Sequence, residues 1–165
     1  MVGKFGRVGA ELSTYEFALS LFTAGILHPQ YFSNPVSIAW LRASFTEAIE
    51  CPKAEEISMP HRAPCTFWMT VLWGCLLKSL GFEDEALLVL ELVFEEMEQY
   101  AVCNPETSSV RQLQAVVAEN LTKEYVFQHD WVNAWSWAAR IQNLANSTFV
   151  QLPQKCYETL TVFSQ

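Results

Sequence analysis

The sequence has few basic residues and no cluster of them. Its 10 lysines and arginines are scattered among 18 acidic residues, which gives a formal net charge of −8. Proteins that grip nucleic acid neutralise its phosphates with clustered Lys and Arg side chains. The composition therefore argues against nucleic-acid binding by this chain.

Cysteine pairs at metal-binding spacing are also missing. The five cysteines are odd in number and form no C-x-x-C pair, so the sequence predicts neither a disulfide framework nor a zinc site. A reducing compartment is the default environment for such a chain. We expect no metal and no cofactor.

No group of residues has a pattern typical of catalysis. His129 and Asp130, with Glu124 nearby, resemble a base and its orienting carboxylate. Neighbours in a helix point to different sides, however, so we interpret them as part of a solvated helix face. His61 and Arg62 precede a helix, which favours a capping or interface role over an anion site. We predict that the protein is not an enzyme.

No apolar run reaches the roughly 20 residues that a membrane-spanning helix needs. The best candidate, Pro64–Gly81, is shorter and is interrupted by Lys78. It is nevertheless apolar on nearly every face, with Trp68 and Trp73 on different sides. A surface helix of a lone domain shows a narrower apolar stripe. We therefore interpret this helix as the floor of a protein-protein interface, which a hydrophobic content of 51% also favours.

Helical periodicity without the alternation of strands predicts an all-α protein. Gly25 and Gly81 are expected helix stops, His28–Pro35 a turn-rich loop, and Cys51–Pro60 an acidic connector. The expected helices are Glu11–Gly25, Val36–Ile49, a helix that starts after Pro64 and ends at Leu80, Asp84–Val102, and Ser108–Ile141.

The last of these helices would be on the order of 50 Å long, which is typical of a projecting arm. Its predicted apolar stripe continues through Phe127, Trp131, Trp135 and Ala138. Beyond it, Phe149–Phe163 is predicted to be an irregular tail around a proline.

The tryptophans of the segment Trp131–Trp137 allow three interpretations. They fit a buried core, or an aromatic contact between subunits, because tryptophan is enriched at interfaces. The segment is also similar to the second homology segment of Bcl-2-like proteins, and Leu72–Gly74 to their first. The alternative function is therefore a helical Bcl-2-like module that binds a host protein.

A second resemblance covers nearly the whole chain and keeps its motifs in order. Val8–Glu11 resembles F-G-A-T, and Tyr31–Val36 resembles D-F-F-P-S-V. The clearest local match is Phe45–Pro52, which resembles Y-R-E-A-L-E-S-P. Ser58–His61 then resembles S-P-H-H, and Thr70–Gly74 resembles A-I-L-C-W-G. With these motifs in this order, the chain resembles the hepadnavirus core (capsid) protein of the hepatitis B virus type.

The resemblance continues toward the C-terminus. Ser109–Val117 is similar to S-R-D-L-V-V, and Phe149–Tyr157 to V-W-I-R-T-P-P-A-Y. Trp131 and Arg140 fall where the family's fourth helix has a tryptophan and a final arginine. The distance from the mammalian pattern suggests a fish hepadnavirus or a nackednavirus.

The resemblance implies a subunit whose long antiparallel helical hairpin pairs with a second copy into a four-helix-bundle dimer spike. Residues 1–165 would be a single assembly domain, with the hairpin at about 63–141, an additional tip helix at about 84–102 and an interdimer segment at about 142–165. Dimers would build an icosahedral shell around pregenomic RNA or a DNA genome, in the virion and in the host cytoplasm or nucleus. The family's arginine-rich RNA-binding tail is expected to be absent from this chain.

The resemblance also implies two interfaces. The family's inter-subunit cysteine is Leu72 here, so an inter-subunit disulfide would need Cys75 instead. By the resemblance, Tyr157 inserts into a pocket of the neighbouring dimer. The expected intradimer residues are Trp68, Met69, Leu72, Trp73, Cys75, Leu76, Leu80, Val110, Leu113, Val117 and Leu121, and the expected interdimer residues are Tyr31, Phe32, Trp131, Phe149, Val150, Leu152, Pro153 and Tyr157.

Overall fold

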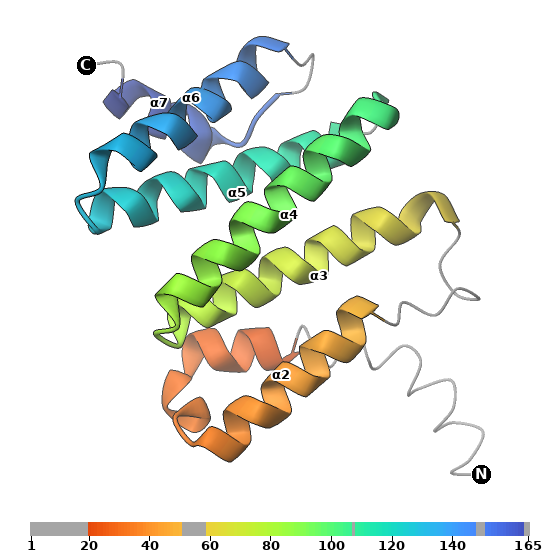
Figure 1. The fold of residues 1–165 in the computed structure, drawn as a ribbon, viewed down its shortest axis with the longest axis vertical. Helices are drawn as coiled ribbons and strands as arrows, with labels where there is room; N and C mark the ends of the chain where they lie inside the picture. Colours follow the sequence, from red (N-terminus) through yellow and green to blue (C-terminus); the bar gives the residue numbers. More distant parts are fainter. Residues whose placement is uncertain (1–19, 51–58, 107, 148–150, 164–165) are drawn as a thin grey trace. The chain divides into compact units, whose positions relative to one another are not determined.

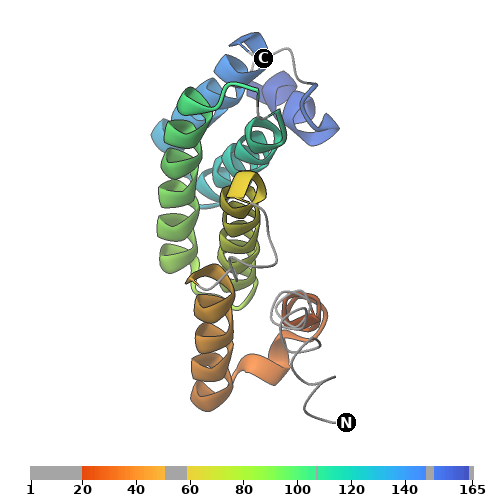
Figure 2. The ribbon, with the colours of Figure 1, turned by 90° about the vertical axis from the view of Figure 1, so that its right-hand side faces the viewer.

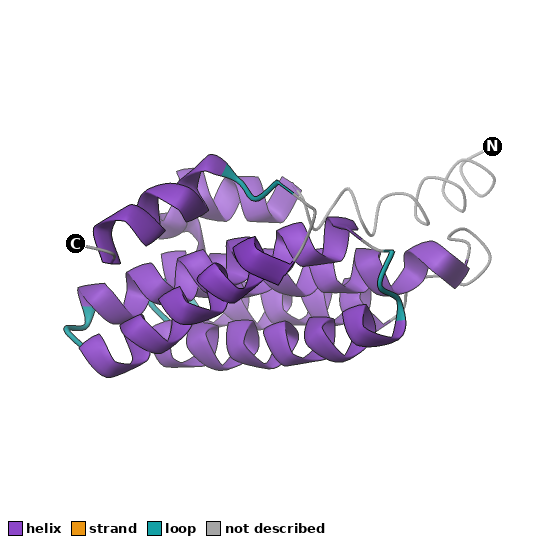
Figure 3. Ribbon diagram, turned by 90° about the horizontal axis from the view of Figure 1, so that it is seen from above, coloured by secondary structure: helices purple, strands orange, loops and turns teal. Residues whose placement is uncertain are grey.

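The computed structural model describes residues 20–50, 59–106, 108–147 and 151–163. Every regular element in these ranges is a helix (Figure 3). The predicted all-α class is thus confirmed for the described part of the chain.

The chain forms two compact units, Met1–Val89 and Leu90–Gln165 (Figure 1). The boundary between them lies inside a continuous helix, α4 (Glu83–Cys103). The first unit therefore contains the start of α4, and the second contains its remainder.

The first unit is built around α2 (Pro35–Glu50), which packs against α3 (Met59–Ser79) and the 3-10 helix η1 (Pro29–Phe32). Residues 20–27 are also helical. The ring of Trp73 stacks on that of Phe45 at a centroid distance of 5.0 Å. The buried residues of this core are Leu21, Phe32, Leu41, Phe45, Met69, Leu72 and Leu76.

Local signals explain where α2 and α3 begin. The Asn34 side chain accepts a hydrogen bond from the Val36 N–H at 2.8 Å, and Pro35 occupies the first helical position, where a missing N–H costs little. The predicted helix Val36–Ile49 is confirmed within one residue at each end. α3 begins earlier than predicted, at Met59, since Pro60 falls in the tolerant first turn. Residues 51–58 of the expected acidic connector Cys51–Pro60 lie outside the described ranges, and Met59 and Pro60 belong to α3.

The sequence predicts that Gly25 ends the first helix. This prediction is wrong, because the helical segment continues to residue 27. The described part of the predicted helix Glu11–Gly25 begins at residue 20. A β-carbon at position 25 would overlap Cδ1 of the fully buried Leu76. Gly25 is therefore a contact point between this segment and α3.

Gly81, by contrast, is the predicted helix stop. It has a φ of 92° and donates its N–H to the Lys78 carbonyl at 3.1 Å. The Phe82 N–H bonds to the Leu77 carbonyl at 2.9 Å, which completes a Schellman motif. α4 follows with three acidic residues in its first turn, where they complement the helix dipole.

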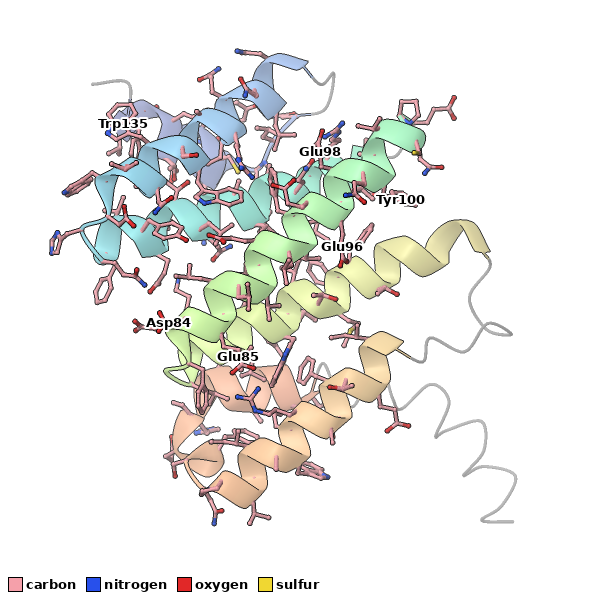
Figure 4. The ribbon with its side chains drawn as sticks, in the orientation of Figure 1. Asp84, Glu85, Glu96, Glu98, Tyr100 and Trp135 are labelled. Carbon is pink, nitrogen blue, oxygen red and sulfur yellow. The ribbon has the colours of Figure 1, made fainter. Side chains whose placement is uncertain are left out.

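Arg42 of α2 connects to the start of α4 through Glu85, which Figure 4 labels. Two hydrogen bonds join the guanidinium to the carboxylate, one of them from Nη2 to Oε2 at 2.7 Å and a shorter one from Nη1 to Oε1. The guanidinium also lies 5.3 Å from the ring of Phe82 and 5.8 Å from that of Trp73. The hydrogen bonds from Arg42 lower the pKa of Glu85 despite its partial burial.

We expect Arg42→Ala to lower the free energy of unfolding by about 1 kcal/mol at neutral pH, since both side chains are partly exposed. Glu85 has a depressed pKa in the folded state, so the contribution of the pair is present above the ordinary pKa of 4.5 and is lost as the pH falls through the lower folded value. Urea unfolding of the wild type and the variant over a pH series measures the contribution of the Arg42–Glu85 pair to the free energy of unfolding. A difference that persisted unchanged in strong acid would contradict it. Arg42→Lys is the matched control, because lysine keeps the positive charge but cannot make the two parallel hydrogen bonds of the guanidinium.

The second unit contains the rest of α4 with α5 (Ser108–Phe127), α6 (Trp131–Ser147) and α7 (Gln154–Phe163). α5 and α6 lie side by side (Figures 1 and 2). The Gln112 side chain near the start of α5 donates a hydrogen bond to the Gln151 carbonyl beyond the end of α6, at 3.3 Å. α5 and α6 therefore form an antiparallel hairpin.

The predicted single helix Ser108–Ile141 is wrong, because residues 128–130 form a turn. His129 adopts a φ of 59° and donates its N–H to the Val126 carbonyl, while the Asp130 N–H bonds to the Tyr125 carbonyl at 2.9 Å. These bonds make a second Schellman motif, with histidine in the left-handed position. Asp130 then caps α6, because its Oδ1 accepts the Asn133 N–H at 3.2 Å.

The predicted irregular tail is also wrong in part, since Gln154–Phe163 forms α7. Cys156 and Thr159 are its buried positions, and both contact α5. α6 likewise continues to Ser147, beyond the predicted end at Ile141. The C-terminal part of the chain thus adds a third helix to the α5–α6 hairpin.

Candidate interaction surfaces

The predicted intradimer residues of α3 divide into a buried and an outer group. Met69, Leu72 and Leu76 belong to the core of the first unit. Trp68 is 41% exposed, and it is the large apolar side chain that α3 presents to solvent among its described residues. Trp73 and Leu80 are partly buried and pack against the same core. Met69, Leu72 and Leu76, which were expected at the intradimer interface, therefore fill the core of their own unit instead.

Cys75 is half-buried, seven residues after Trp68. Positions seven apart lie on one face of a helix, so the thiol and the exposed tryptophan share a side of α3. Burial raises the pKa of the Cys75 thiol, and the nearby Lys78 partly offsets this. A smaller fraction of this thiol is therefore present as the thiolate that disulfide exchange requires.

The predicted intradimer residues of α5 are mainly buried. Val110, Val117 and Leu121 have almost no exposed surface, and Leu113 is half-buried. In this arrangement the first three offer no surface to a second copy.

The predicted interdimer residues are spread over both units. Phe32 is buried in the first unit, and the side chain of Tyr31 lies outside the described set, as do Phe149 and Val150. In the second unit, Leu152 is buried and Pro153 half-buried, whereas Trp131 is 52% and Tyr157 38% exposed. Trp131 and Tyr157 are therefore the aromatic residues of this set that retain accessible surface.

Tyr157 is anchored at its polar end. Its hydroxyl oxygen accepts a hydrogen bond from the Leu152 N–H at 3.2 Å. The ring lies on α7, one residue after Cys156, whose thiol donates to the Ala115 carbonyl of α5 at 3.5 Å. Burial, reinforced by the negative charge of Glu119, raises the pKa of the Cys156 thiol to about 11. Cys156 is thus a packing residue, and Tyr157 is its exposed neighbour.

The tryptophans of α6 lie on opposite sides of the helix. Trp137 is 5% exposed and packs edge-on against Phe94 of α4 at a centroid distance of 4.9 Å. Trp135, labelled in Figure 4, is 56% exposed and packs edge-on against Phe163 of α7, also at 4.9 Å. The core interpretation therefore holds for Trp137, whereas Trp131 and Trp135 are available for contacts.

A shallow apolar groove runs between α6 and α7, with a volume of about 250 Å³. The sequence-based prediction missed it because α7 was expected to be irregular. The spacing of Cys156, Thr159 and Phe163 was a helical signal that could have revealed it. The residues that line the groove are Trp135, Ala138, Ala139, Gln142, Leu160 and Phe163.

A second pocket, of about 320 Å³, contains two arginines with acidic partners from α4. Arg111 pairs with Glu98 at 2.6 Å, and Glu98 also accepts a bond from the buried Gln114 (Figure 4 labels Glu98). Arg140 pairs with Glu95 at 2.8 Å and lies 4.1 Å from the ring of Trp137. Because each guanidinium is matched by a carboxylate, this pocket is a stabilising network and offers little attraction to an anion.

The residues considered for a catalytic role do not converge. His129 and Asp130 form the turn after α5, so their interpretation as a solvated helix face is wrong. Asp130 is engaged in capping α6, and the buried Glu124 accepts a hydrogen bond from Gln128 at 3.3 Å. The side chains of His61 and Arg62 lie outside the described set.

Across the described ranges, no three His, Cys, Asp or Glu side chains gather as a metal site would require. None of the described helices has the combined length and apolar character of a membrane span. These ranges therefore define an all-helical protein with exposed aromatic surfaces. The chain matches no protein-family model, no curated protein and no solved structure.

Proposed function

We propose that the protein is a viral capsid (core) subunit of hepadnavirus type that forms homodimers and assembles into an icosahedral shell around the viral genome. The proposal includes the hairpin expected at about residues 63–141, which pairs with its copy into a four-helix-bundle spike and has α4 as an additional helix at its tip. It places the protein in the virion and in the host cytoplasm or nucleus. The ordered series of resembling motifs supports this family.

The observation that carries the proposal is the exposed apolar surface. Trp68, Trp131 and Trp135 are between 41% and 56% exposed. Tryptophan is a costly residue to leave in water and is enriched where proteins meet. Repeated contacts of this kind, each worth about 1.5–3 kcal/mol, suit a shell built from many weak interfaces.

Assembly is tested directly by light scattering and negative-stain imaging of the purified protein at low and at raised salt. We expect dimers at low salt and closed particles at raised salt, since screening reduces the repulsion between chains of net charge −8. A monodisperse monomer under every condition would refute the proposal.

We expect Tyr157→Ala to leave dimers intact and to abolish particles, because the variant removes an exposed ring assigned to the contact between dimers. The matched control is Tyr157→Phe, which loses only the bond that the hydroxyl accepts from Leu152. Size-exclusion chromatography with light scattering, followed by imaging, measures both effects. Particles of normal yield from Tyr157→Ala would show that this contact is wrongly assigned.

The groove between α6 and α7 favours a second function, that of a Bcl-2-like module that captures an amphipathic helix of a host protein. Its apolar lining, which includes Trp135 and Phe163, suits the side chains that such a helix inserts into a groove. Tight binding of a helical death-domain peptide by a monomer, measured through tryptophan fluorescence, would support this function. Assembly into particles without peptide binding would exclude it in favour of the capsid.

A further inference from the structure

The turn between α5 and α6 contains neither of the strong helix breakers, and Asp130 as a cap is its local signal. The range 108–147 contains neither glycine nor proline, and its apolar pattern predicts one continuous helix. The structure instead interrupts the helix for the three residues 128–130. The apolar pattern of this segment is thus compatible with a straight helix, whereas the structure shows the bent form.

The bent form carries a conformational cost that the straight form would not have. His129 is the only non-glycine residue with a positive φ in the described ranges, at 59°. This left-handed conformation is unfavourable for an L-residue with a β-carbon. A straight helix would place His129 at an ordinary negative φ and would restore regular hydrogen bonds across the turn.

The bent form is held by the apolar face that α6 packs along α5. This face does not depend on which chain supplies α5, because the α5 of a second copy presents the same surface. A three-residue connection under strain is the kind of hinge through which identical elements are exchanged between protomers. The buried residues of α6 are Ala134, Trp137, Ala138, Ile141 and Leu144.

Large apolar side chains lie in water on both sides of the turn. Phe127 is 73%, Trp131 52% and Val132 81% exposed. In a straight helix Phe127 and Trp131 would be four residues apart on one face. Two straight helices that cross at this point would cover these side chains, which the bent monomer leaves in solvent. A second copy would supply the same apolar residues at the same point, and it can also supply the α5 face on which α6 packs.

We propose that two copies of the chain exchange α6 and α7 by straightening residues 128–130, so that the C-terminal helices of each copy pack on α5 of the other. This inference rests on the proposed self-association and specifies how the copies are joined. The exchange loses the turn hydrogen bonds from His129 to Val126 and from Asp130 to Tyr125. The packing of α6 and α7 on α5 is re-formed between copies, as are the contacts of Trp137 with Phe94 and of Arg140 with Glu95 of α4.

The exchange is tested by measuring one distance within a single chain. Nitroxides are attached at positions 112 and 146 of the full chain through a ketone-bearing amino acid, which leaves the cysteines intact. Doubly labelled protein is mixed with an excess of unlabelled protein, and dimers and monomers are separated before pulsed electron paramagnetic resonance. The two positions lie at adjacent ends of the bent hairpin, but would be about 50 Å apart along a straight helix.

We expect the long intrachain distance in the dimer and the short one in the monomer. A dimer that keeps only the short distance overturns the exchange and leaves the proposed self-association standing. The absence of any dimer overturns both. The two proposals can therefore fail separately.

Substitutions at the hinge give an independent readout. His129→Gly removes the conformational cost of the bent form and weakens the straight helix. We therefore expect it to lower the association constant for dimerisation by at least roughly 5-fold. His129→Ala should raise that constant, because alanine favours the helix and disfavours positive φ. The matched control is Ser136→Gly, which weakens α6 equally in both forms and should leave the constant unchanged. Equal dimerisation of all three variants overturns the proposal.

Discussion

Replacing Trp137 by alanine is expected to lower the free energy of unfolding of the second unit by about 3–5 kcal/mol. The side chain is 5% exposed and packs edge-on against Phe94. Its ring also faces the guanidinium of Arg140 at 4.1 Å, while that guanidinium pairs with Glu95. Loss of the ring therefore opens a cavity and also removes the surface on which a charged group rests.

Trp135→Ala is the matched control, since it removes the same side chain two positions earlier. The ring of Trp135 is 56% exposed and contacts Phe163, so we expect a loss of only about 0.5–1.5 kcal/mol. Urea unfolding followed by far-ultraviolet circular dichroism compares the two without relying on tryptophan fluorescence. Equal losses would mean that the division between buried and exposed tryptophans is wrong.

Gly25→Ala is expected to destabilise the first unit by about 1–3 kcal/mol, although alanine in a helix normally stabilises by about 0.5–1 kcal/mol. The reason is steric, because the new methyl group would overlap Cδ1 of Leu76, which is fully buried and cannot rotate into solvent. Thermal unfolding of the variant measures the net sign. Increased stability would show that the two helices can move apart at little cost.

A double-mutant cycle identifies the cause of this effect. Leu76→Ala alone should cost about 2–5 kcal/mol, because it leaves a cavity. In the double variant the alanine at position 25 no longer meets the leucine side chain, so the total loss should be smaller than the sum of the two single losses. Simple additivity would contradict a contact between these positions.

Helix boundaries set by local chemistry could be predicted from the sequence. Asn34 and Pro35 specify the start of α2, and Gly81 specifies the end of α3 through its positive φ. These signals act within one turn of the backbone, so they need no knowledge of the rest of the fold. Gly25 misled the prediction because its role depends on Leu76, a residue distant in sequence.

The sequence left the roles of the α6 tryptophans open for a physical reason. The apolar stripe of α5 was continued through Trp131 and Trp135 as if the helix were unbroken. The turn at His129 separates α5 from α6, so the apolar face of α6 does not continue that of α5. The buried face of α6 includes Trp137 instead. Asp130, a good capping residue directly before an apolar helix, was the available signal for this break.

Helical periodicity identifies apolar positions but cannot assign an apolar side chain to its own core or to a partner. Met69 and Leu76 fill the core of the first unit, whereas Trp68 on the same helix is exposed. That distinction depends on which neighbours cover the helix, and this is a tertiary property.

The short turn between α5 and α6 also affects the order of folding. Helices joined by residues 128–130 meet after closing a minimal loop, so the contacts of this hairpin are local in sequence. The contact between Gly25 and Leu76 must instead close a long loop, with a larger entropic cost before any burial is gained. The α5–α6 hairpin can therefore form early and independently, while the core around Leu76 forms only after the chain has brought distant segments together.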